Sequence, residues 1–202
     1  MGSAPVSKQP IYLADTVQVA TKILVAGHFG VGKTTYVGTL SEIDPLRTEE
    51  VMTASSVGYD DLVGLPDKKT TTVAMDFGRL TLSPRLVLYL FGAPGQERFR
   101  RLWQDLAYGA LGALVLADTR NLAESFPVFD RVEEFGLPYG VAVNHFASGR
   151  RFDEAEVRDA LDLHHDTPLV TCDARDPQSS TIALIRLVEH LHERAVHQES
   201  FR

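Results

Sequence analysis

The chain has 202 residues, of which 44% are apolar and 23% charged, values that suit one α/β domain with a full core. Its formal net charge of −7 argues against non-specific nucleic-acid binding and against a polybasic membrane anchor, because both need a basic face. The single cysteine, Cys172, excludes an internal disulfide. No apolar run approaches the roughly 20 residues of a membrane span, and residues 1–10 lack the regions of a signal peptide. We therefore expect a cytoplasmic protein.

Short apolar runs between turn residues predict six strands, with helical patterns between them. The expected strands are 22–26, 72–82, 85–91, 111–117, 139–143 and 169–172. The expected helices begin at Gly32, within 96–110, at Ser125, at Asp153 and at Asp176. This alternation predicts a mainly parallel six-stranded sheet with one antiparallel edge strand and helices on both faces. Ligands of such sheets bind in the loops at the carboxyl ends of the strands.

Three further expectations concern regions outside these strands. Residues 44–69 show neither helical nor strand periodicity and are expected to form a long exposed loop. The stripe Ile182, Ile185, Val188 and Leu191 is expected to face the core from the last helix. One domain is expected over 21–195, with an N-terminal extension at 1–20 and a C-terminal tail at 196–202.

The strand at 22–26 leads into GHFGVGKTT, which matches the pattern G-x-x-x-x-G-K-[ST] of a phosphate loop. In such a loop, main-chain N–H groups surround the phosphates, and the N-terminus of the following helix adds partial positive charge. Lys33 is the residue expected to contact the β- and γ-phosphates, and Thr34 is expected to bind Mg²⁺. A glycine-rich turn without a ligand is the alternative. The predicted phosphate-binding residues are Gly27, His28, Phe29, Gly30, Val31, Gly32, Lys33, Thr34 and Thr35.

Four loops decide which class of P-loop protein this is. Thr72 lies 38 residues after Thr34, and Gly95-Gln96-Glu97 follows the strand at 85–91. Asn144 follows the strand at 139–143, and Cys172-Asp173-Ala174 ends the strand at 169–172. Over residues 21–195 this ordered set resembles the Ras-like small GTPases, which implies a G domain that binds GTP, GDP and Mg²⁺.

Within that superfamily the sequence is most similar to the bacterial MglA-type GTPases, because Pro94-Gly95-Gln96 replaces the Ala-Gly-Gln of eukaryotic relatives. Five segments look like the actinobacterial conservon GTPases: KILVAGHFGVGKTT, PLRTEEVMTASSVG, TTTVAMDFGRL, LYLFGAPGQERF and VLADTR. This resemblance implies a signalling role, a Roadblock-domain regulator and a sensor-kinase-like partner complex.

The resemblance also implies roles for the two switch segments. Thr72 fits the threonine that binds Mg²⁺ and senses the γ-phosphate, although Thr71 leaves the register open by one residue. The spacing from Thr72 to Asp76 favours Thr72, and a β-branched strand start is the alternative interpretation. Gly95 fits the glycine whose N–H meets the γ-phosphate. Gln96 fits the catalytic residue that orients the attacking water, with Lys33 assisting, and a solvated loop residue is its alternative.

Two residues expected of a fast GTPase are absent. Most Ras-like proteins have an Asp where Gly92 stands, and its loss predicts a functioning switch with weaker magnesium binding. Asp118 is either a substitute for that Asp or a strand-end cap. MglA-type proteins often have an Arg where Thr71 stands, so we expect hydrolysis about 10³–10⁵ slower than an assisted rate and an activating partner in trans.

The loop expected to select the base also departs from the family pattern Asn-Lys-x-Asp. Here it reads Asn144-His145-Phe146-Ala147, so His145 replaces the Lys and Ala147 replaces the Asp that grips guanine. Asp153 is either a distant substitute or the cap of a helix. Guanine then depends on Asn144 and on the backbone N–H of Ala174, with a reduced advantage over adenine.

Three hypotheses remain open from the sequence. The first is a guanine-nucleotide switch with slow hydrolysis. The second is a pseudo-GTPase that holds nucleotide without turnover, and the third is an ATP-using P-loop protein, raised by Ala147. Phe99, Leu102 and Trp103 are either partner contacts or core residues of the helix after Gln96.

Overall fold

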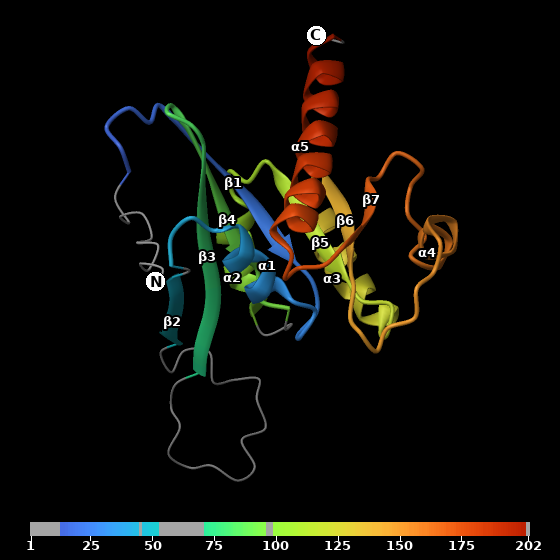
Figure 1. Cartoon of the computed structure of the whole chain (residues 1–202). Coiled ribbons are helices and arrows are strands. Elements are labelled where there is room, and N and C mark those ends of the chain that lie inside the picture. The colour runs from blue at the N-terminus through green and yellow to red at the C-terminus, as the bar shows by residue number, and fades with distance from the viewer. Residues whose placement is uncertain (1–12, 45, 53–70, 96–98, 201–202) are drawn as a thin grey trace, which may run out of the picture.

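The computed structural model describes residues 13–44, 46–52, 71–95 and 99–200 (Figure 1). The strands are β1 (Val19–Ala26), β2 (Leu46–Met52), β3 (Thr71–Ser83), β4 (Leu86–Gly92), β5 (Gly112–Ala117), β6 (Tyr139–Asn144) and β7 (Leu169–Cys172). The helices are α1 (Lys33–Leu40), α2 (Arg100–Ala107), α3 (Phe126–Glu134), α4 (Glu154–Ala160) and α5 (Pro177–Ser200), with a 3₁₀ turn, η3, at Leu122–Ser125. The first strand thus begins before residue 21, and α5 continues past residue 195.

The described strands form one sheet in the order β2-β3-β4-β1-β5-β6-β7. Only β3 among them runs antiparallel to its neighbours, so the predicted class of mainly parallel α/β sheet is confirmed. The antiparallel strand lies second from the edge, because β2 adds a seventh strand outside it. The expectation of a loop throughout 44–69 was therefore wrong for β2, while 53–69 lie outside the described residues. The sequence of β2, LRTEEVM, does not alternate between apolar and polar residues, so periodicity alone could not reveal this strand. Every residue of β2 pairs with β3.

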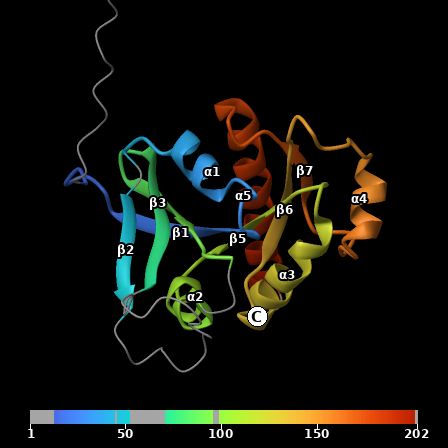
Figure 2. The ribbon, with the colours of Figure 1, turned by 90° about the horizontal axis from the view of Figure 1, so that it is seen from below.

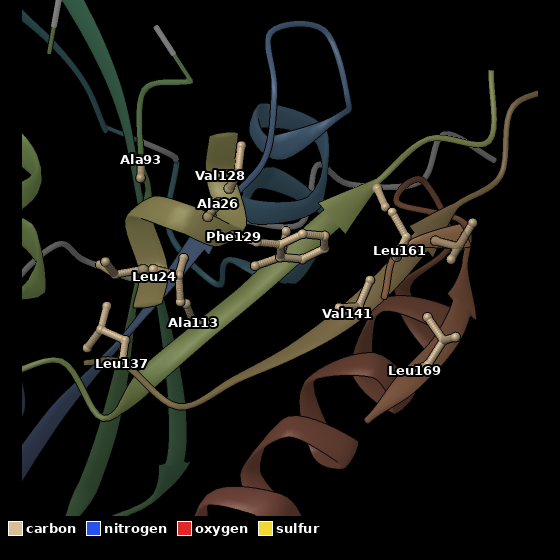
Figure 3. Close-up of a cluster of buried hydrophobic side chains, with 14 of the residues drawn as sticks. Leu24, Ala26, Ala93, Ala113, Val128, Phe129, Leu137, Val141, Leu161 and Leu169 are labelled. Carbon is tan, nitrogen blue, oxygen red and sulfur yellow. The ribbon is translucent and has the colours of Figure 1, made fainter. Parts of the chain in front are cut away.

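The helices cover both faces of the sheet, as Figure 2 shows, with α1 and α5 on one face and α2 and α3 on the other. The first face packs on a core that includes Ile23, Val25, Tyr36, Val37, Leu90, Leu114, Ala183, Leu184 and Leu187. The second face packs on Leu24, Ala26, Trp103, Leu106, Val115, Val128, Phe129, Val132, Val157 and Leu161, part of which Figure 3 shows. The central strands are buried on both faces of the sheet, which explains why their sequences are continuously apolar.

The helix after residue 96 packs inward through its aromatic residues. Phe99 and Trp103 are 6% and 0% exposed, and Leu102 is half-buried. The Trp103 indole N–H donates to the carbonyl of Pro94 at 2.9 Å. For Phe99 and Trp103 the interpretation as core residues is confirmed, and Trp103 also anchors the segment that follows β4.

The predicted core stripe of α5 was wrong for Ile182, Ile185 and Val188, and only its last residue, Leu191, packs on the core. Ile182 and Ile185 are each 49% exposed, and Val188 is also exposed. A spacing of three residues drifts around a helix of 3.6 residues per turn, so this stripe moves off the core face. The residues that contact the sheet follow spacings of three and four instead: Ser180, Ala183, Leu184, Leu187 and Leu191.

No helix among the described residues is both long enough and apolar enough to cross a lipid bilayer.

The burial of α5 gives a stability prediction with an internal control. Leu187→Ala removes a side chain that is fully buried, so the free energy of unfolding should fall by about 2–5 kcal/mol. Ile185→Ala on the exposed side should change it by less than about 1 kcal/mol. Chemical denaturation of both variants measures the difference, and equal losses would contradict the orientation of α5.

Candidate functional site

The loops at the carboxyl ends of β1, β4, β5, β6 and β7 lie along one edge of the sheet, since these strands are parallel. The segment 27–32 connects β1 to α1 and reverses the chain direction. Gly32 has φ 107° in the left-handed region, and a Cβ there would lie 2.5 Å from Nδ2 of Asn144. Gly27 has φ 145°, and its Cβ would lie 2.7 Å from the carbonyl oxygen of Leu116. Both positions therefore require glycine.

Lys33 is the first residue of α1 and bends back over the loop. Its ammonium donates to the carbonyl oxygens of Gly27 at 2.7 Å and His28 at 2.8 Å. Burial lowers the pKa of Lys33 to about 8, against an opposing effect from the charge of Asp76. Lys33 thus loses its proton at a lower pH than an exposed lysine does, and an anion bound beside it would stabilise the charged form.

Thr34, the next residue, contacts an acid that sequence reasoning assigned no chemical role. Its hydroxyl donates to Oδ2 of Asp76 at 2.5 Å. Asp76 is 8% exposed and lies on β3 directly opposite Gly92 of β4. A Cβ on Gly92 would lie 3.0 Å from the Cβ of Asp76 and 3.2 Å from its Oδ2. A carboxylate from the neighbouring strand therefore occupies the space beside Gly92.

The sequence signal for this contact was a glycine at position 92, where the family has an acid, together with an acid at position 76 in the preceding strand. Asp76 lies between Met75 and Phe77 in β3, and Gly92 ends the strand that pairs with it. Their contact depends on the register of β3 against β4, which the local sequence does not specify.

Asn144 ties the other loops to the phosphate loop. Its Nδ2 donates to the carbonyl of Val31 at 2.8 Å, and its Oδ1 accepts the N–H of Ala174 at 2.9 Å. The N–H of His145 donates to the carbonyl of Cys172 at 2.7 Å. The structure therefore brings the predicted residues Asn144 and Ala174 together, although the N–H of Ala174 is bonded to Asn144 here.

The two acids considered as substitutes both have structural partners. Asp118 accepts the backbone N–H of Arg120 at 2.9 Å and its Nη2 at 2.6 Å. Burial acts to raise the pKa of Asp118, but these hydrogen bonds outweigh it and the net pKa is lowered. Asp153 forms a capping box with Glu156 at the start of α4. The interpretation of Asp118 as a strand-end cap and Asp153 as a helix cap is confirmed.

Three more predicted residues lie beside the phosphate loop or the base loop. Phe29 is 80% exposed. His28 bonds the carbonyl of Phe29 through Nδ1, while its buried Nε2 has no hydrogen-bond partner within the described residues. The ring of Phe146 stacks under the guanidinium of Arg120, whose carbon lies 3.6 Å from the ring centroid. Phe146 thus packs against the loop after β5.

The switch residues are placed only in part. Gly95 lies against the phosphate loop, since a Cβ there would be 2.7 Å from the carbonyl oxygen of Gly27. Thr71 and Thr72 begin β3 and pair in register with Met52 and Val51 of β2. Gln96 lies outside the described residues, so its catalytic role stays a prediction. The backbone does not distinguish Thr71 from Thr72 as the threonine that binds metal.

The fold has close counterparts among solved structures. The G domain of the T. maritima FeoB iron transporter superposes with a TM-score of 0.60 at 17% identity, covering 85% of this chain and 99% of that one. The cytosolic domain of the same transporter in GDP form I gives 0.61 at 18% identity, covering 86% of this chain. This chain spans only 64% of that longer domain. At these identities the likeness establishes the fold, which is the G-domain fold of P-loop NTPases.

Two comparisons were made at the level of sequence. A search of curated protein sequences found no match to the chain. A family profile described as "Conserved hypothetical ATP binding protein" matches residues 25–194, which include the phosphate loop and nearly all of the sheet. The chain therefore belongs to this family of conserved hypothetical ATP binding proteins.

Proposed function

We propose that this chain is a guanine-nucleotide switch that hydrolyses GTP slowly. The observation that carries the proposal is the phosphate loop, in which Lys33 and the start of α1 face the same loop edge as Asn144, Ala174 and Gly95. The fold shared with G domains supports it. One of those neighbours is described in a GDP form.

The phosphate chemistry follows from the loop. Main-chain N–H groups between Gly27 and Thr34 and the N-terminus of α1 would stabilise the negative phosphate oxygens. Lys33 would exchange its two carbonyl partners for the β- and γ-phosphates. Because these phosphates are anionic, they would raise the pKa of Lys33 and keep it charged.

The oxygen ligands fit a magnesium ion, which would supply positive charge to the phosphates. Thr34 and Thr72 would bind the ion through their hydroxyls. The carboxylate of Asp76, already at hydrogen-bond distance from Thr34, would orient that hydroxyl toward the ion. The weaker magnesium binding expected from Gly92 is then offset by Asp76.

Turnover would depend on Gln96, which orients the attacking water, and on a partner that supplies positive charge. None of the sequence neighbours of the switches matches an arginine finger, so intrinsic hydrolysis is slow. By resemblance to the MglA-type and conservon GTPases, the partner would be a Roadblock-domain regulator within a sensor-kinase-like complex. GTP would order the switch segments and so change the surface that this partner contacts.

A second function has its own support. Ala147 removes the carboxylate that grips guanine, and the family to which the chain belongs is described as ATP binding. These observations favour a P-loop protein with relaxed base selection, or a nucleotide-holding scaffold without turnover.

Nucleotide binding and turnover test the proposed function together. Wild type should bind labelled GTP and GDP in the presence of Mg²⁺ and hydrolyse GTP slowly in single-turnover assays. Lys33→Ala should weaken binding by at least about 10²-fold, since one charge-assisted contact contributes about 1.5–3 kcal/mol and Lys33 has two phosphates to contact. Gln96→Leu should keep binding and lose hydrolysis. Equal, negligible rates in wild type and Gln96→Leu would favour the scaffold instead.

The lowered pKa of Lys33 predicts a pH dependence of GDP affinity. Below about pH 8 the ligand-free protein carries a charged Lys33, so affinity should be flat. Above that pH, binding must take up a proton, and affinity should fall about tenfold for each pH unit. Equilibrium titrations between about pH 7 and pH 9 measure this slope. Lys33→Arg is the control, because a guanidinium stays charged throughout and should remove the slope. A slope unchanged in Lys33→Arg would assign the titration to another group.

The contact between Asp76 and Gly92 predicts a rescue. Asp76→Asn should raise the Mg²⁺ concentration needed for half-maximal nucleotide binding by about 10–100-fold. The double variant Asp76→Gly with Gly92→Asp returns a carboxylate to the same gap and should recover most of the loss. Exposed Asp105→Asn serves as the matched control. An Asp76→Asn protein with wild-type magnesium dependence would contradict the assignment.

A further inference from the structure

Guanine selection needs an acid at the base end of the site, because guanine presents two adjacent N–H donors where adenine presents a ring nitrogen acceptor. A carboxylate accepts from both donors of guanine and repels the lone pair of adenine. In the loop after β6 the expected position is Ala147, which is exposed and has no such group. Base selection therefore depends on which other acid lies beside Asn144 and Ala174.

Two nearby acids are already committed elsewhere. Asp118 is 2% exposed and is held by Arg120, and Asp153 caps α4 through the backbone N–H of Glu156 at 2.8 Å. Moving either would break the hydrogen bonds that hold the buried Asp118 carboxylate, or a helix cap. Neither is available to a base.

Asp173 lies where the loop after β6 meets the loop after β7. It directly follows β7, between Cys172, whose carbonyl accepts the N–H of His145, and Ala174, whose N–H donates to Asn144. Its own N–H donates to Oγ of Ser179 at 2.9 Å, so the backbone on both sides is fixed. The position of this carboxylate is therefore set by the same contacts that hold Asn144 on the phosphate loop.

The electrostatics of Asp173 suit a hydrogen-bond acceptor. Its carboxylate accepts from the backbone N–H and Nε of Arg175 at 3.0 and 2.9 Å, and from Nη2 at 2.7 Å. These bonds lower the pKa of Asp173 to about 2, and the nearby His145 contributes to the shift. The group is thus ionised at all physiological pH values. His145 being close enough to act on it also places Asp173 beside the loop that replaces Asn-Lys-x-Asp.

The Asp173 carboxylate is still accessible. Its side chain is 31% exposed and that of Arg175 is 68% exposed. An exposed ion pair of this kind contributes only about 0–1 kcal/mol, so a ligand can share or replace it. A carboxylate has about four lone-pair sites, and Arg175 takes three bonds, which leaves room for a further donor even before any rearrangement.

We propose that Asp173 is the residue that selects guanine, with its carboxylate supplied by the loop after β7 instead of the loop after β6. The inference rests on the proposed nucleotide-binding function and specifies its base. It replaces the expectation that guanine depends on Asn144 and Ala174 alone. Arg175 is the positioning residue, because it holds the carboxylate ionised and oriented.

The test compares GTP, ATP and XTP, each displacing a fluorescent nucleotide at constant Mg²⁺. Wild type should prefer GTP to ATP and XTP. Asp173→Asn exchanges one acceptor oxygen for an amide donor, which pairs with the 2-oxo group of xanthine and not with the 2-amino group of guanine. GTP affinity should fall by about 10²-fold, as expected for losing a charge-assisted hydrogen bond, while XTP affinity rises, so that the order of the two reverses. A misfolded protein cannot gain affinity for XTP.

Two further variants sharpen the result. Asp153→Asn, an acid of the same loop region that caps α4, should keep the wild-type order of nucleotides. Adding Ala147→Asp to Asp173→Asn should restore preference for GTP by returning an acid to the loop after β6. The inference would be overturned if Asp173→Asn kept the wild-type ratios, or if wild type bound ATP as well as GTP. A wild-type protein that bound no nucleotide would instead contradict the proposed function itself.

Discussion

The site depends on the reversal of the chain between β1 and α1, which the backbone achieves within the six residues 27–32. Left-handed glycines at both ends of that turn point two carbonyls at Lys33 and leave the first N–H groups of α1 facing the loop edge. Each neighbouring loop then docks on this turn. Asn144 reaches Val31, and Gly95 lies against Gly27. A change in the turn would therefore displace the groups that face the phosphates, the metal and the base together.

Two carboxylates lie on segments that neighbour this turn. Asp76 of β3 occupies the gap beside Gly92 of β4, and Asp173 of the loop after β7 stands beside the loop in which Ala147 replaces an acid. In the functions proposed above, they take the roles of the acids absent at positions 92 and 147. Several segments reach this edge, because the carboxyl ends of the parallel strands meet there and antiparallel β3 pairs with the end of β4 at Gly92.

Much of the fold and part of the site could be predicted from the sequence, and the division has a physical cause. The phosphate loop is a local motif whose glycines and lysine lie within eight residues, so its pattern was sufficient to predict the turn between β1 and α1. The buried strands and the capping box of Asp153 are local signals as well. Asp76 depends on strand register, β2 depends on pairing with β3, and the orientation of α5 depends on what it packs against. These are long-range contacts that no short pattern contains. Thr72 lies at the start of β3, as the strand pattern predicts, and its role toward a metal stays a prediction.

The central claim is that Lys33 and the main-chain turn hold a triphosphate whose metal is supported by Asp76. The most direct measurement is a crystal structure with Mg²⁺ and a non-hydrolysable GTP analogue. The account predicts that Nζ of Lys33 leaves the carbonyls of Gly27 and His28 for the β- and γ-phosphates, with Thr34 on the metal and Asp76 beside it. A nucleotide bound elsewhere, with Lys33 still on those two carbonyls, would contradict it.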